Sequence, residues 1–350
     1  MSCLQEDLGV VGVPDLGSEG TIANGGALSS LPLMVSDNPE TVSGASGTLW
    51  QHSLASASGA ITSRLFLWHV NGSGSSKKLG VTVENTGDTP LKISSVKRQT
   101  GTGGDYLEIG KCNAKALLGA TLDNHTPVDA GDIAAGSVGL VEEFSWNSGA
   151  FRGAQYEITV ATSSGSGNVS YILRTVWGAT TSNLRTFKAS PVALVGTHPR
   201  GSWPASEITV DLIWGTGPTA PPVTQSYRLA NRVHDFICKA ADSELPNLAS
   251  DNPANFGSIC RKINLKLQNM SMEDVTVAVY VNPRGGAFAG SVRASTMLPG
   301  ARGIPKLNAP GDAVRLGTIV SPKQTQKTEE IELVVAGGSA TPLLIIVVPL

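Results

Sequence analysis

Charged residues are scarce in this sequence. Of its 350 residues only 15% are Asp, Glu, Lys or Arg, whereas ordinary globular domains have about 25%. The net charge is -2, and no basic stretch is interleaved with aromatic residues, which argues against a nucleic-acid partner. Gly (40), Ser, Thr and Val are abundant instead. This balance favours many short strands joined by turns over helices.

Long apolar runs are missing as well. A bilayer-spanning helix needs about 20 apolar residues, and the run LLIIVVPL at the end of the sequence is far shorter. The first residues, MSCLQEDLGVVGVPDLG, carry Glu6 and Asp7 where a signal peptide has basic residues. We therefore expect no membrane span and no signal peptide within this sequence. Export would use another route, or the sequence is that of a mature chain with an added Met.

Motifs for catalysis are also absent. The sequence has no GxSxG elbow, no HExxH and no CxxC pair, and its Gly-rich stretches do not complete a phosphate-binding loop. His69 is the candidate general base, with Glu84 as its candidate carboxylate partner. We interpret it as a structural histidine. The sequence thus indicates that this protein is not an enzyme.

The four cysteines, Cys3, Cys112, Cys238 and Cys260, are isolated. Cys238 and Cys260 lie in one predicted domain and can close a loop as a disulfide, and buried free thiols are the alternative. Cys3 lies in the N-terminal segment, where it can cross-link subunits.

Alternating apolar residues give the clearest structural signal. Residues 65–70 are apolar with no helical period, and residues 79–85 place Leu79, Val81 and Val83 on one side. Because the intervening NGSGSS tolerates turn geometry, we predict an antiparallel hairpin at the centre of a sheet. Residues 156–177 predict a second hairpin, and residues 263–281 repeat the pattern. The residues expected in the cores are Val81, Val83, Ile158, Val160, Leu265, Val277 and Val279.

The whole pattern predicts an all-β protein with two antiparallel β-sandwich or jelly-roll-like domains. We expect an extended arm over residues 1–30, one sandwich over 31–195 and another over 196–350, with the boundary in the Gly- and Pro-rich stretch 196–204. The two halves share a pattern without a residue-level repeat. A helix is expected over residues 113–118, and a short strand or turn over 106–109.

Two acidic turns are candidate calcium sites. Asp37 with Glu40, and Asp129 with Asp132, offer the oxygen ligands that Ca²⁺ prefers. The alternative is ordinary turn chemistry, in which such side chains hydrogen-bond to the nearby backbone. No other cofactor is expected.

The N-terminal segment is the candidate assembly element. Its apolar positions, Val10, Val11, Val13 and Leu16 among them, allow a short strand to pair with an exposed sheet edge. The edge can belong to a neighbouring copy or to the same chain.

Several short motifs occur in a characteristic order. These are DNPE at Asp37–Glu40, His-x-Asn-Gly at His69–Gly72, the pair Lys77–Lys78, ENT at Glu84–Thr86 and Arg-Gly-Gly at Arg284–Gly286. From residue 33 to 350 the sequence resembles an uncharacterised module of secreted and cell-surface proteins of Gram-positive bacteria, often found with copper-amine-oxidase-like domains. The resemblance implies an extracellular β-rich module with no established activity.

Together these features predict a non-catalytic structural subunit of an extracellular or cell-surface assembly, a filament or a surface layer. Its expected partners are copies of itself and cell-wall glycans. The alternative is a carbohydrate-binding, lectin-like surface module that uses aromatic residues as a stacking platform. The six tryptophans are Trp50, Trp68, Trp146, Trp177, Trp203 and Trp214.

Overall fold

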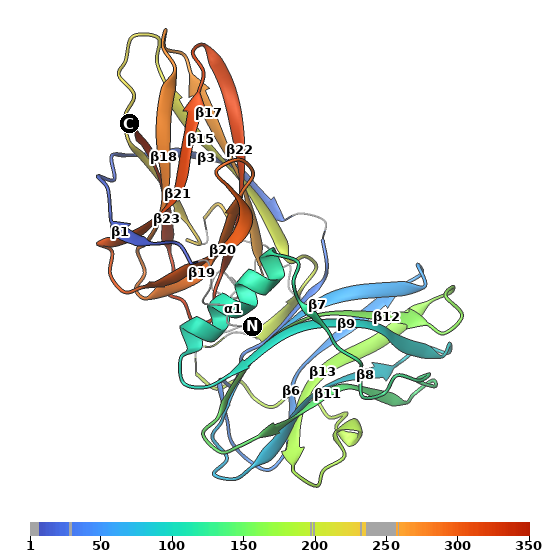
Figure 1. The fold of residues 1–350 in the computed structure, drawn as a ribbon. Coiled ribbons are helices and arrows are strands. Elements are labelled where there is room, and N and C mark those ends of the chain that lie inside the picture. Colours follow the sequence, from blue (N-terminus) through green and yellow to red (C-terminus); the bar gives the residue numbers. More distant parts are fainter. Residues whose placement is uncertain are drawn as a thin grey trace.

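The computed structural model describes residues 7–27, 30–196, 198, 200–231, 233–235, 257 and 259–350. Its strands form four sheets that pair into two β-sandwiches, with an α-helix between them (Figure 1). The predicted all-β class is therefore confirmed. No helix in the described ranges is long and apolar enough to span a membrane.

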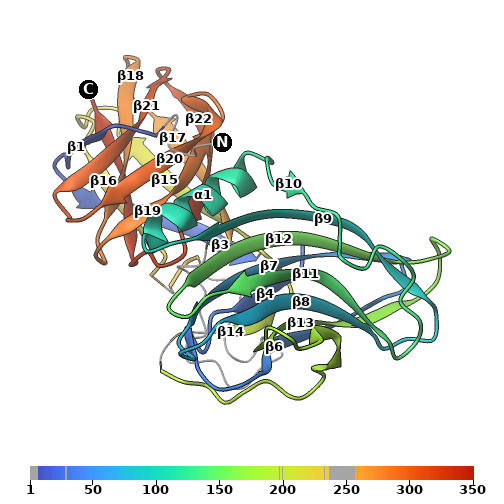
Figure 2. The same ribbon diagram turned by 60° about the horizontal axis from the view of Figure 1, so that its bottom comes forward.

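The first sandwich has a larger sheet, 1A, and a smaller sheet, 1B, which lie in two layers (Figure 2). Its strands are β4 (Leu33–Ser36), β5 (Thr41–Val42), β6 (Gly47–Ser56), β7 (Ala60–Asn71), β8 (Lys77–Asn85), β9 (Leu91–Thr102), β10 (Asp123–Asn124), β11 (Val138–Trp146), β12 (Phe151–Thr162), β13 (Val169–Ala179) and β14 (Arg200–Trp203). Sheet 1A has the order β10-β9-β12-β7-β4-β14, with β5 also paired to β7, and sheet 1B has the order β11-β8-β13-β6. A 3₁₀ turn, η1 (Leu184–Thr186), follows β13.

The second sandwich combines the C-terminal half with the N-terminal segment. Its strands are β1 (Val10–Gly12), β2 (Ser18–Glu19), β3 (Thr21–Ala27), β15 (Glu207–Thr216), β16 (Gln225–Leu229), β17 (Cys260–Asn269), β18 (Val275–Pro283), β19 (Phe288–Ala294), β20 (Leu298–Leu307), β21 (Asp312–Ser321), β22 (Thr325–Val335) and β23 (Leu343–Pro349). Sheet 2A has the order β20-β19-β22-β17-β15-β3, and sheet 2B has the order β1-β21-β18-β23-β16-β2.

Each sandwich encloses an apolar core of its own, as the period-two alternation requires. All seven residues that the sequence predicts in the cores are fully buried. The prediction of purely antiparallel sheets is wrong at four strand pairs, because β4 runs parallel to β7, β5 to β7, β15 to β17 and β2 to β16.

The two sandwiches have the same topology. The path β10-β9-β12-β7-β4 in sheet 1A corresponds to β20-β19-β22-β17-β15 in sheet 2A, and β11-β8-β13-β6 corresponds to β21-β18-β23-β16. In both, the strand at the start of the domain runs parallel to its neighbour. The structure therefore contains a tandem repeat.

The predicted hairpins are wrong, because the strands in question belong to opposite sheets. β7 pairs with β12 in sheet 1A, while β8 pairs with β11 and β13 in sheet 1B. β12 and β13 are separated in the same way, and so are β17 and β18. Each connection is an arch that crosses the core from one layer to the other. Alternation identified which residues are buried but not which layer each strand joins.

Two of these arches are built alike, around a buried asparagine. The Asn71 side chain donates from Nδ2 to the carbonyls of Ser75 and Trp146, at 2.9 and 2.7 Å, and its Oδ1 accepts from the Ser73 N–H and hydroxyl. In the second sandwich, Asn269 makes the equivalent bonds. Its Nδ2 donates to the carbonyls of Glu273 and Ser321, and its Oδ1 accepts from the N–H and hydroxyl of Ser271.

The repeat therefore extends to single residues, which corrects the expectation of a shared pattern alone. The arch sequences NGSGS and NMSME align on their Asn and Ser. Asn85 in β8 and Asn282 in β18 are similar only in part. Asn282 donates two hydrogen bonds to the segment that enters β21, whereas Asn85 donates one to Ile133, ahead of β11, and one to Thr89, ahead of β9.

The two sandwiches exchange their edge strands. β3 directly precedes β4 of the first sandwich but pairs with β15 of the second, and β14 directly precedes β15 but pairs with β4. Each sandwich thus adds to one of its sheets, 1A or 2A, the strand that leads into the other sandwich. The predicted boundary at 196–204 therefore falls on a strand of the first sandwich.

The N-terminal segment forms strands on its own chain. Val10 and Val11 lie opposite Val314 and Ala313, and the N–H of Val13 donates to the carbonyl of Gly311. Val10 and Val11 remain exposed, and Leu16 is half-buried. The segment is not a free arm over its described part, since it covers edges of the second sandwich.

Helix α1 (Tyr106–Leu118) lies between the sandwiches. Asp105 caps it by accepting a hydrogen bond from the N–H of Glu108, and Gly119 ends it. Leu107, Ala114 and Leu118 pack on the outer face of sheet 2A. The expected helix over 113–118 is therefore longer than predicted, and the predicted strand or turn at 106–109 is wrong. The spacing of Asp105 and Glu108 is the N-terminal signal that indicates this start.

The disulfide suggested for Cys238 and Cys260 is not formed. Cys260 is a free thiol buried at the start of β17, and burial raises its pKa to about 12. Cys238 and Cys3 lie outside the described residues. Cys112 on α1 is disulfide-bonded.

Candidate functional site

The chain that leaves the first sandwich is fastened beside the DNPE turn. The side chain of Asn38 donates to the carbonyls of Val195 and His198 and accepts from the Val195 N–H at 2.9 Å. Arg200, at the start of β14, is buried and donates to the carbonyls of Leu49 and Val192. We call this set the linker clamp. It fixes the segment that carries His198.

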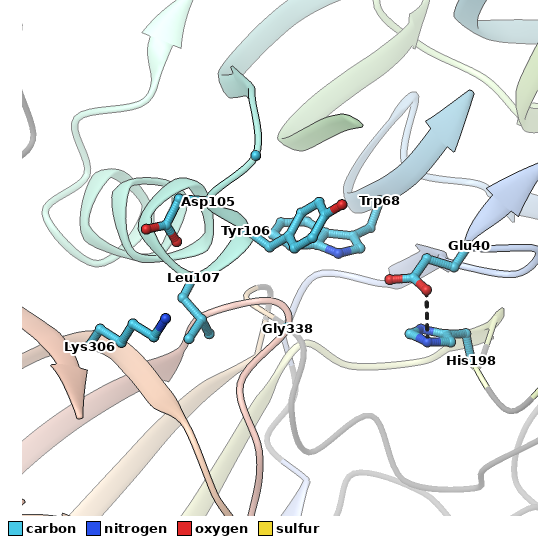
Figure 3. Close-up of a pocket in the computed structure, with 9 residues that line it drawn as sticks. Glu40, Trp68, Asp105, Tyr106, Leu107, His198, Lys306 and Gly338 are labelled. Carbon is cyan, nitrogen blue, oxygen red and sulfur yellow. Dashed lines mark ion pairs between the residues drawn. The ribbon is translucent and has the colours of Figure 1, made fainter. Parts of the chain in front are cut away.

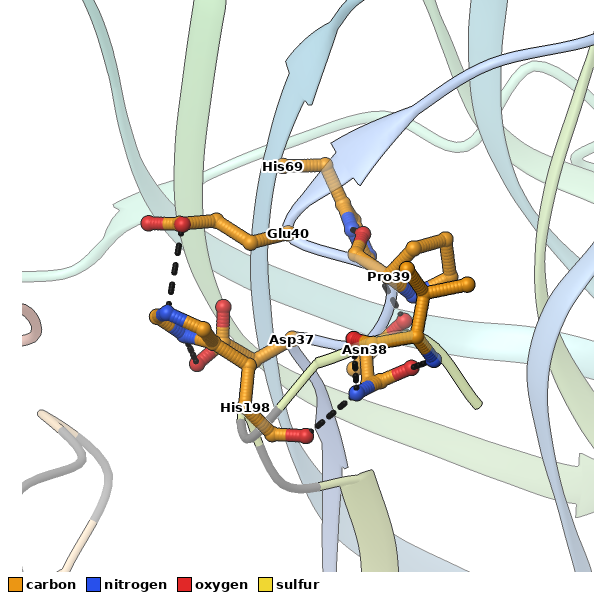
Figure 4. Close-up of polar contacts among 8 residues, drawn as sticks. Asp37, Asn38, Pro39, Glu40, His69 and His198 are labelled. Atoms are coloured by element: carbon orange, nitrogen blue, oxygen red, sulfur yellow. Dashed lines mark hydrogen bonds and ion pairs between the residues drawn. The ribbon is translucent and has the colours of Figure 1, made fainter. Parts of the chain in front are cut away.

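His198 sits between two carboxylates of the DNPE turn (Figure 4). Its Nδ1 lies 3.1 Å from Oδ2 of Asp37 and its Nε2 lies 3.2 Å from Oε2 of Glu40. The hydrogen bond to Asp37 raises the pKa of His198. Burial raises the pKa of Asp37 to about 7, against the opposing hydrogen bond to His198. Asp37 therefore titrates near neutral pH, beside an imidazole whose pKa is raised.

His69 lies under the same turn but has no access to solvent. It is fully buried, its Nδ1 lies 2.8 Å from the carbonyl of Pro39, and its Nε2 lies 2.9 Å from Oγ of Ser36. Because a carbonyl only accepts, Nδ1 carries the proton and Nε2 accepts from the serine hydroxyl. Burial lowers the pKa of His69 to about 4. Its partners make it part of the core.

Glu84, the carboxylate suggested for His69, points elsewhere. It pairs with Arg174 at 2.6 Å and with Lys188 at 2.9 Å. The two members of the candidate catalytic pair are therefore not brought together.

A cavity of about 480 Å³ opens between the two sandwiches (Figure 3). Its lining comes from four parts of the chain: the DNPE turn and β7, the first turn of α1, the linker, and the second sandwich. The lining residues are Glu40, Trp68, Gly104, Asp105, Tyr106, Leu107, His198, Lys306 and Gly338. The volume lies within the usual range for small-molecule sites, about 300–1,000 Å³.

The aromatic wall of this cavity is held by packing. Phe151 contacts Trp68 and Tyr106 edge to face, at centroid distances of 4.5 and 4.7 Å. Trp68 is nearly buried, whereas 42% of Tyr106 is exposed. Gly338, with φ +80°, lies close to both residues, since a Cβ there would lie 3.6 Å from the Trp68 ring and 3.6 Å from the Cβ of Tyr106. The wall is thus preformed, and Tyr106 is its accessible ring.

The cavity can bind a ligand through its polar groups and its aromatic ring. Glu40 offers a carboxylate acceptor at its edge, and His198 offers its ring nitrogens. No Ser, Thr or Cys lies among the described lining residues. This chemistry suits binding by hydrogen bonds and aromatic contact.

The calcium candidates have other partners. Asp37 and Glu40 face His198, and Asp129 binds the Arg185 guanidinium through both oxygens, at 2.6 and 2.7 Å. Asp132 accepts a hydrogen bond from Ser163. Across the part of the chain that the structure describes, no group of three or more His, Cys, Asp or Glu side chains could hold a metal ion.

Sequence reasoning did not find this cavity. All six tryptophans are buried, so they form no surface platform. His198 contacts Asp37, which lies 161 positions away in the sequence. No local spacing of residues predicts such a contact. The DNPE turn and Trp68 were visible signals, but the partner that completes them was not.

Comparisons with known proteins add little. A scan against protein-family models and a search of curated proteins found no match. The exported protein XepA of PBSX is similar over 87% of this chain and 86% of its own, at 9% identity and a TM-score of 0.20. The CBM22-1–CBM22-2 tandem of Paenibacillus barcinonensis Xyn10C is similar over 95% and 98%, at 9% identity and a TM-score of 0.17. TM-scores this low carry no argument.

Proposed function

We propose that this chain is a non-catalytic structural subunit of an extracellular or cell-surface assembly, a filament or a surface layer, and acts through contacts between copies of itself. The observation that carries the proposal is an apolar tip on the second sandwich. It consists of Met270, Met272 and Val320, and we call it the methionine tip. Solvent-facing apolar clusters are a usual mark of protein–protein contact.

The methionine tip is a surface that the fold does not need. Met270 and Met272 are 55% and 68% exposed, on the arch that Asn269 closes. Val320 lies opposite Thr276 at the same end of sheet 2B. At the equivalent places in the first sandwich stand Gly72, Gly74 and Ser145. Since the same hydrogen bonds close the arch of the first sandwich around glycine, we assign the methionines to contacts outside the arch.

Strand exchange supports a structural role. β3 and β14 tie each sandwich to the other through main-chain hydrogen bonds, and α1 packs on both. Such coupling fixes the angle between the sandwiches. A fixed angle is what a subunit requires if its contacts are to propagate in a regular assembly.

An extracellular location is part of the same proposal. The disulfide of Cys112 favours an oxidising compartment, because cytosolic thiols are kept reduced. Fractionation of the native host, with immunodetection in the medium and on the cell surface, tests this location. Detection in the cytoplasm alone would overturn it.

Light scattering after size-exclusion chromatography, together with negative-stain microscopy, tests assembly. We expect the wild-type protein to form ordered oligomers or polymers at about 100 µM, a concentration at which contacts of micromolar affinity are occupied. The variant Met270→Ser/Met272→Ser should remain monomeric with an unchanged circular dichroism spectrum. Val128→Ser, which removes an exposed valine of the first sandwich, is the matched control and should assemble normally. A monomeric wild-type protein would refute self-assembly.

A further inference from the structure

We infer that the cavity between the sandwiches is a carbohydrate-binding site, with Tyr106 as the stacking ring. The inference goes beyond the structural role and does not depend on it, because the cavity and the methionine tip are separate surfaces. It also differs from a tryptophan platform, since all six indoles are buried.

The accessible ring points to a ligand with an apolar face. Tyr106 begins α1, where a polar residue would be ordinary, and yet it presents an aromatic ring at the mouth of the cavity. Phe151 packs edge to face against it at 4.7 Å. A ring fixed in this way contacts a flat apolar ligand surface at little cost in conformational entropy. The C–H face of a pyranose ring is such a surface.

The polar groups around the ring point to a ligand with many hydroxyls. Glu40 and Asp105 offer carboxylate acceptors, and Lys306 offers a donor from β20 of the second sandwich. Since Glu40 already faces His198 and Asp105 caps α1, the lining carries both signs of charge without a large excess of either. A purely apolar ligand would cover these polar groups and Lys306 without pairing with them. A neutral sugar pairs with acceptors and donors together.

The walls belong to a rigid junction, so the site is preformed. Trp68 is held in β7, and His198 is held by the linker clamp through Asn38. Strand exchange fixes the wall that carries Lys306 against the wall that carries Tyr106. Preorganisation of this kind lowers the entropic cost of binding.

The test is a titration of the full-length protein with neutral oligosaccharides: cellohexaose, xylohexaose, laminarihexaose, mannohexaose and chitotetraose, each to about 10 mM, which detects millimolar affinity. Isothermal titration calorimetry and saturation-transfer NMR are the readouts. At least one probe should bind. Tyr106→Ala should then weaken binding about tenfold or more, as loss of a central aromatic contact does, and Tyr106→Phe should keep it within about threefold.

Further variants make the test decisive. Lys306 is exposed, so Lys306→Ala should weaken binding without disturbing the fold, as thermal unfolding would verify. Tyr280→Ala, on β18 of sheet 2B and outside the cavity, is the matched control and should bind as wild type. If no probe binds, or if Tyr106→Ala binds as tightly as wild type, the inference is wrong. The state of assembly, measured in the same samples, reports separately on the structural proposal.

Discussion

The two sandwiches share a topology and differ at the surfaces that topology does not use. Asn71 and Asn269 close equivalent arches with the same set of hydrogen bonds, although the neighbouring residues are Gly in one and Met in the other. The two sandwiches share the buried asparagine, whose side chain hydrogen-bonds to the backbone where a strand leaves its sheet. What differs faces solvent, which is where contacts with other molecules are made.

A second difference lies inside the cores. Two residues before the arch asparagine, the first sandwich has His69 and the second has Leu267, and both are fully buried. The leucine packs with its apolar neighbours, whereas the histidine binds Ser36 and the carbonyl of Pro39. The polar residue anchors the DNPE turn, on which the linker clamp and one edge of the cavity depend.

The largest expected effect comes from matched charges in the two cores. Val83→Asp and Val277→Asp each place a carboxylate at a fully buried position, at a cost of several kcal/mol. Because strand exchange couples the sandwiches, differential scanning calorimetry should show one transition in the wild type, and each substitution should lower that whole transition or abolish it.

Two resolved transitions, with only one of them moved by each substitution, would break the comparison. They would mean that the sandwiches fold independently and that the exchanged strands add little. Val320→Asp, at an exposed position of the second sandwich, is the control and should leave the melting temperature almost unchanged.

The next effect concerns the exchanged strands. Deletion of residues 1–27 removes β1, β2 and β3 and exposes the edges of β15, β16 and β21. We expect the melting temperature to fall by about 10 °C, which corresponds to a few kcal/mol for a domain of this size. Deletion of residues 1–6 keeps all three strands and is the control. An unchanged melting temperature in the longer deletion would show that β3 is dispensable.

Local alternation predicted the strands and the core but not the pairing. Val81 and Val83 alternate on β8 and are buried as expected. Five residues of turn sequence, however, allow either a hairpin within one sheet or an arch between two. Alternation does not distinguish a hairpin from an arch, because both connections place the same side chains in the core. The buried Asn71 decides it, through a bond to Trp146 at a distant position in the sequence.

The arch asparagines provide a matched pair of intermediate effect. Asn71→Ala and Asn269→Ala each leave buried backbone groups without partners, which costs about 2 kcal/mol. Because the bonds are equivalent, urea unfolding should give similar losses for the two variants. Ser73→Ala and Ser271→Ala remove only the hydroxyl and should cost less. Losses that differ more than about threefold would show that the arches are alike in geometry and not in energy.

The candidate site could not be predicted from the sequence, because it too depends on contacts between distant parts of the chain. Trp68 and the DNPE turn are local, but the cavity also needs Tyr106, His198 and Lys306, which only the arrangement of the two sandwiches brings together. Asp37 and Glu40 are candidates for calcium in the sequence, with turn chemistry as the alternative, because a turn shows its own carboxylates and not the partner that contacts them. The cation that faces them is His198 from the linker.

The smallest expected effect is the pH dependence of stability that comes from Asp37 and His198. This pair belongs to the DNPE turn and linker of the first sandwich. Burial raises the pKa of Asp37 to about 7, and the bond to Asp37 raises that of His198. Both pKa values lie above those of the unfolded chain, so both groups stabilise the fold when protonated. The contribution of Asp37 is fully present below about pH 4, the unfolded pKa of Asp, and is lost as the pH rises through about 7. The contribution of His198 is fully present below about pH 6.5, the unfolded pKa of His, and is lost as the pH rises through its raised pKa.

Asp37→Asn isolates this effect, because the amide resembles the neutral acid in shape and cannot titrate. We expect the variant to match the wild type in free energy of unfolding at about pH 4 and to become the more stable of the two as the pH rises to 8, where the buried carboxylate of the wild type is charged. Other titrating groups cancel when the two proteins are compared at each pH. Oδ1 of Asp37 is buried without a hydrogen-bond partner, which adds to the cost of the charged form.

Asp132→Asn, on an exposed carboxylate of the same sandwich, is the control and should show no such difference. A gap between Asp37→Asn and wild type that stays the same at both pH values would mean that Asp37 is ionised throughout, and Asp37 and His198 would then form a simple ion pair.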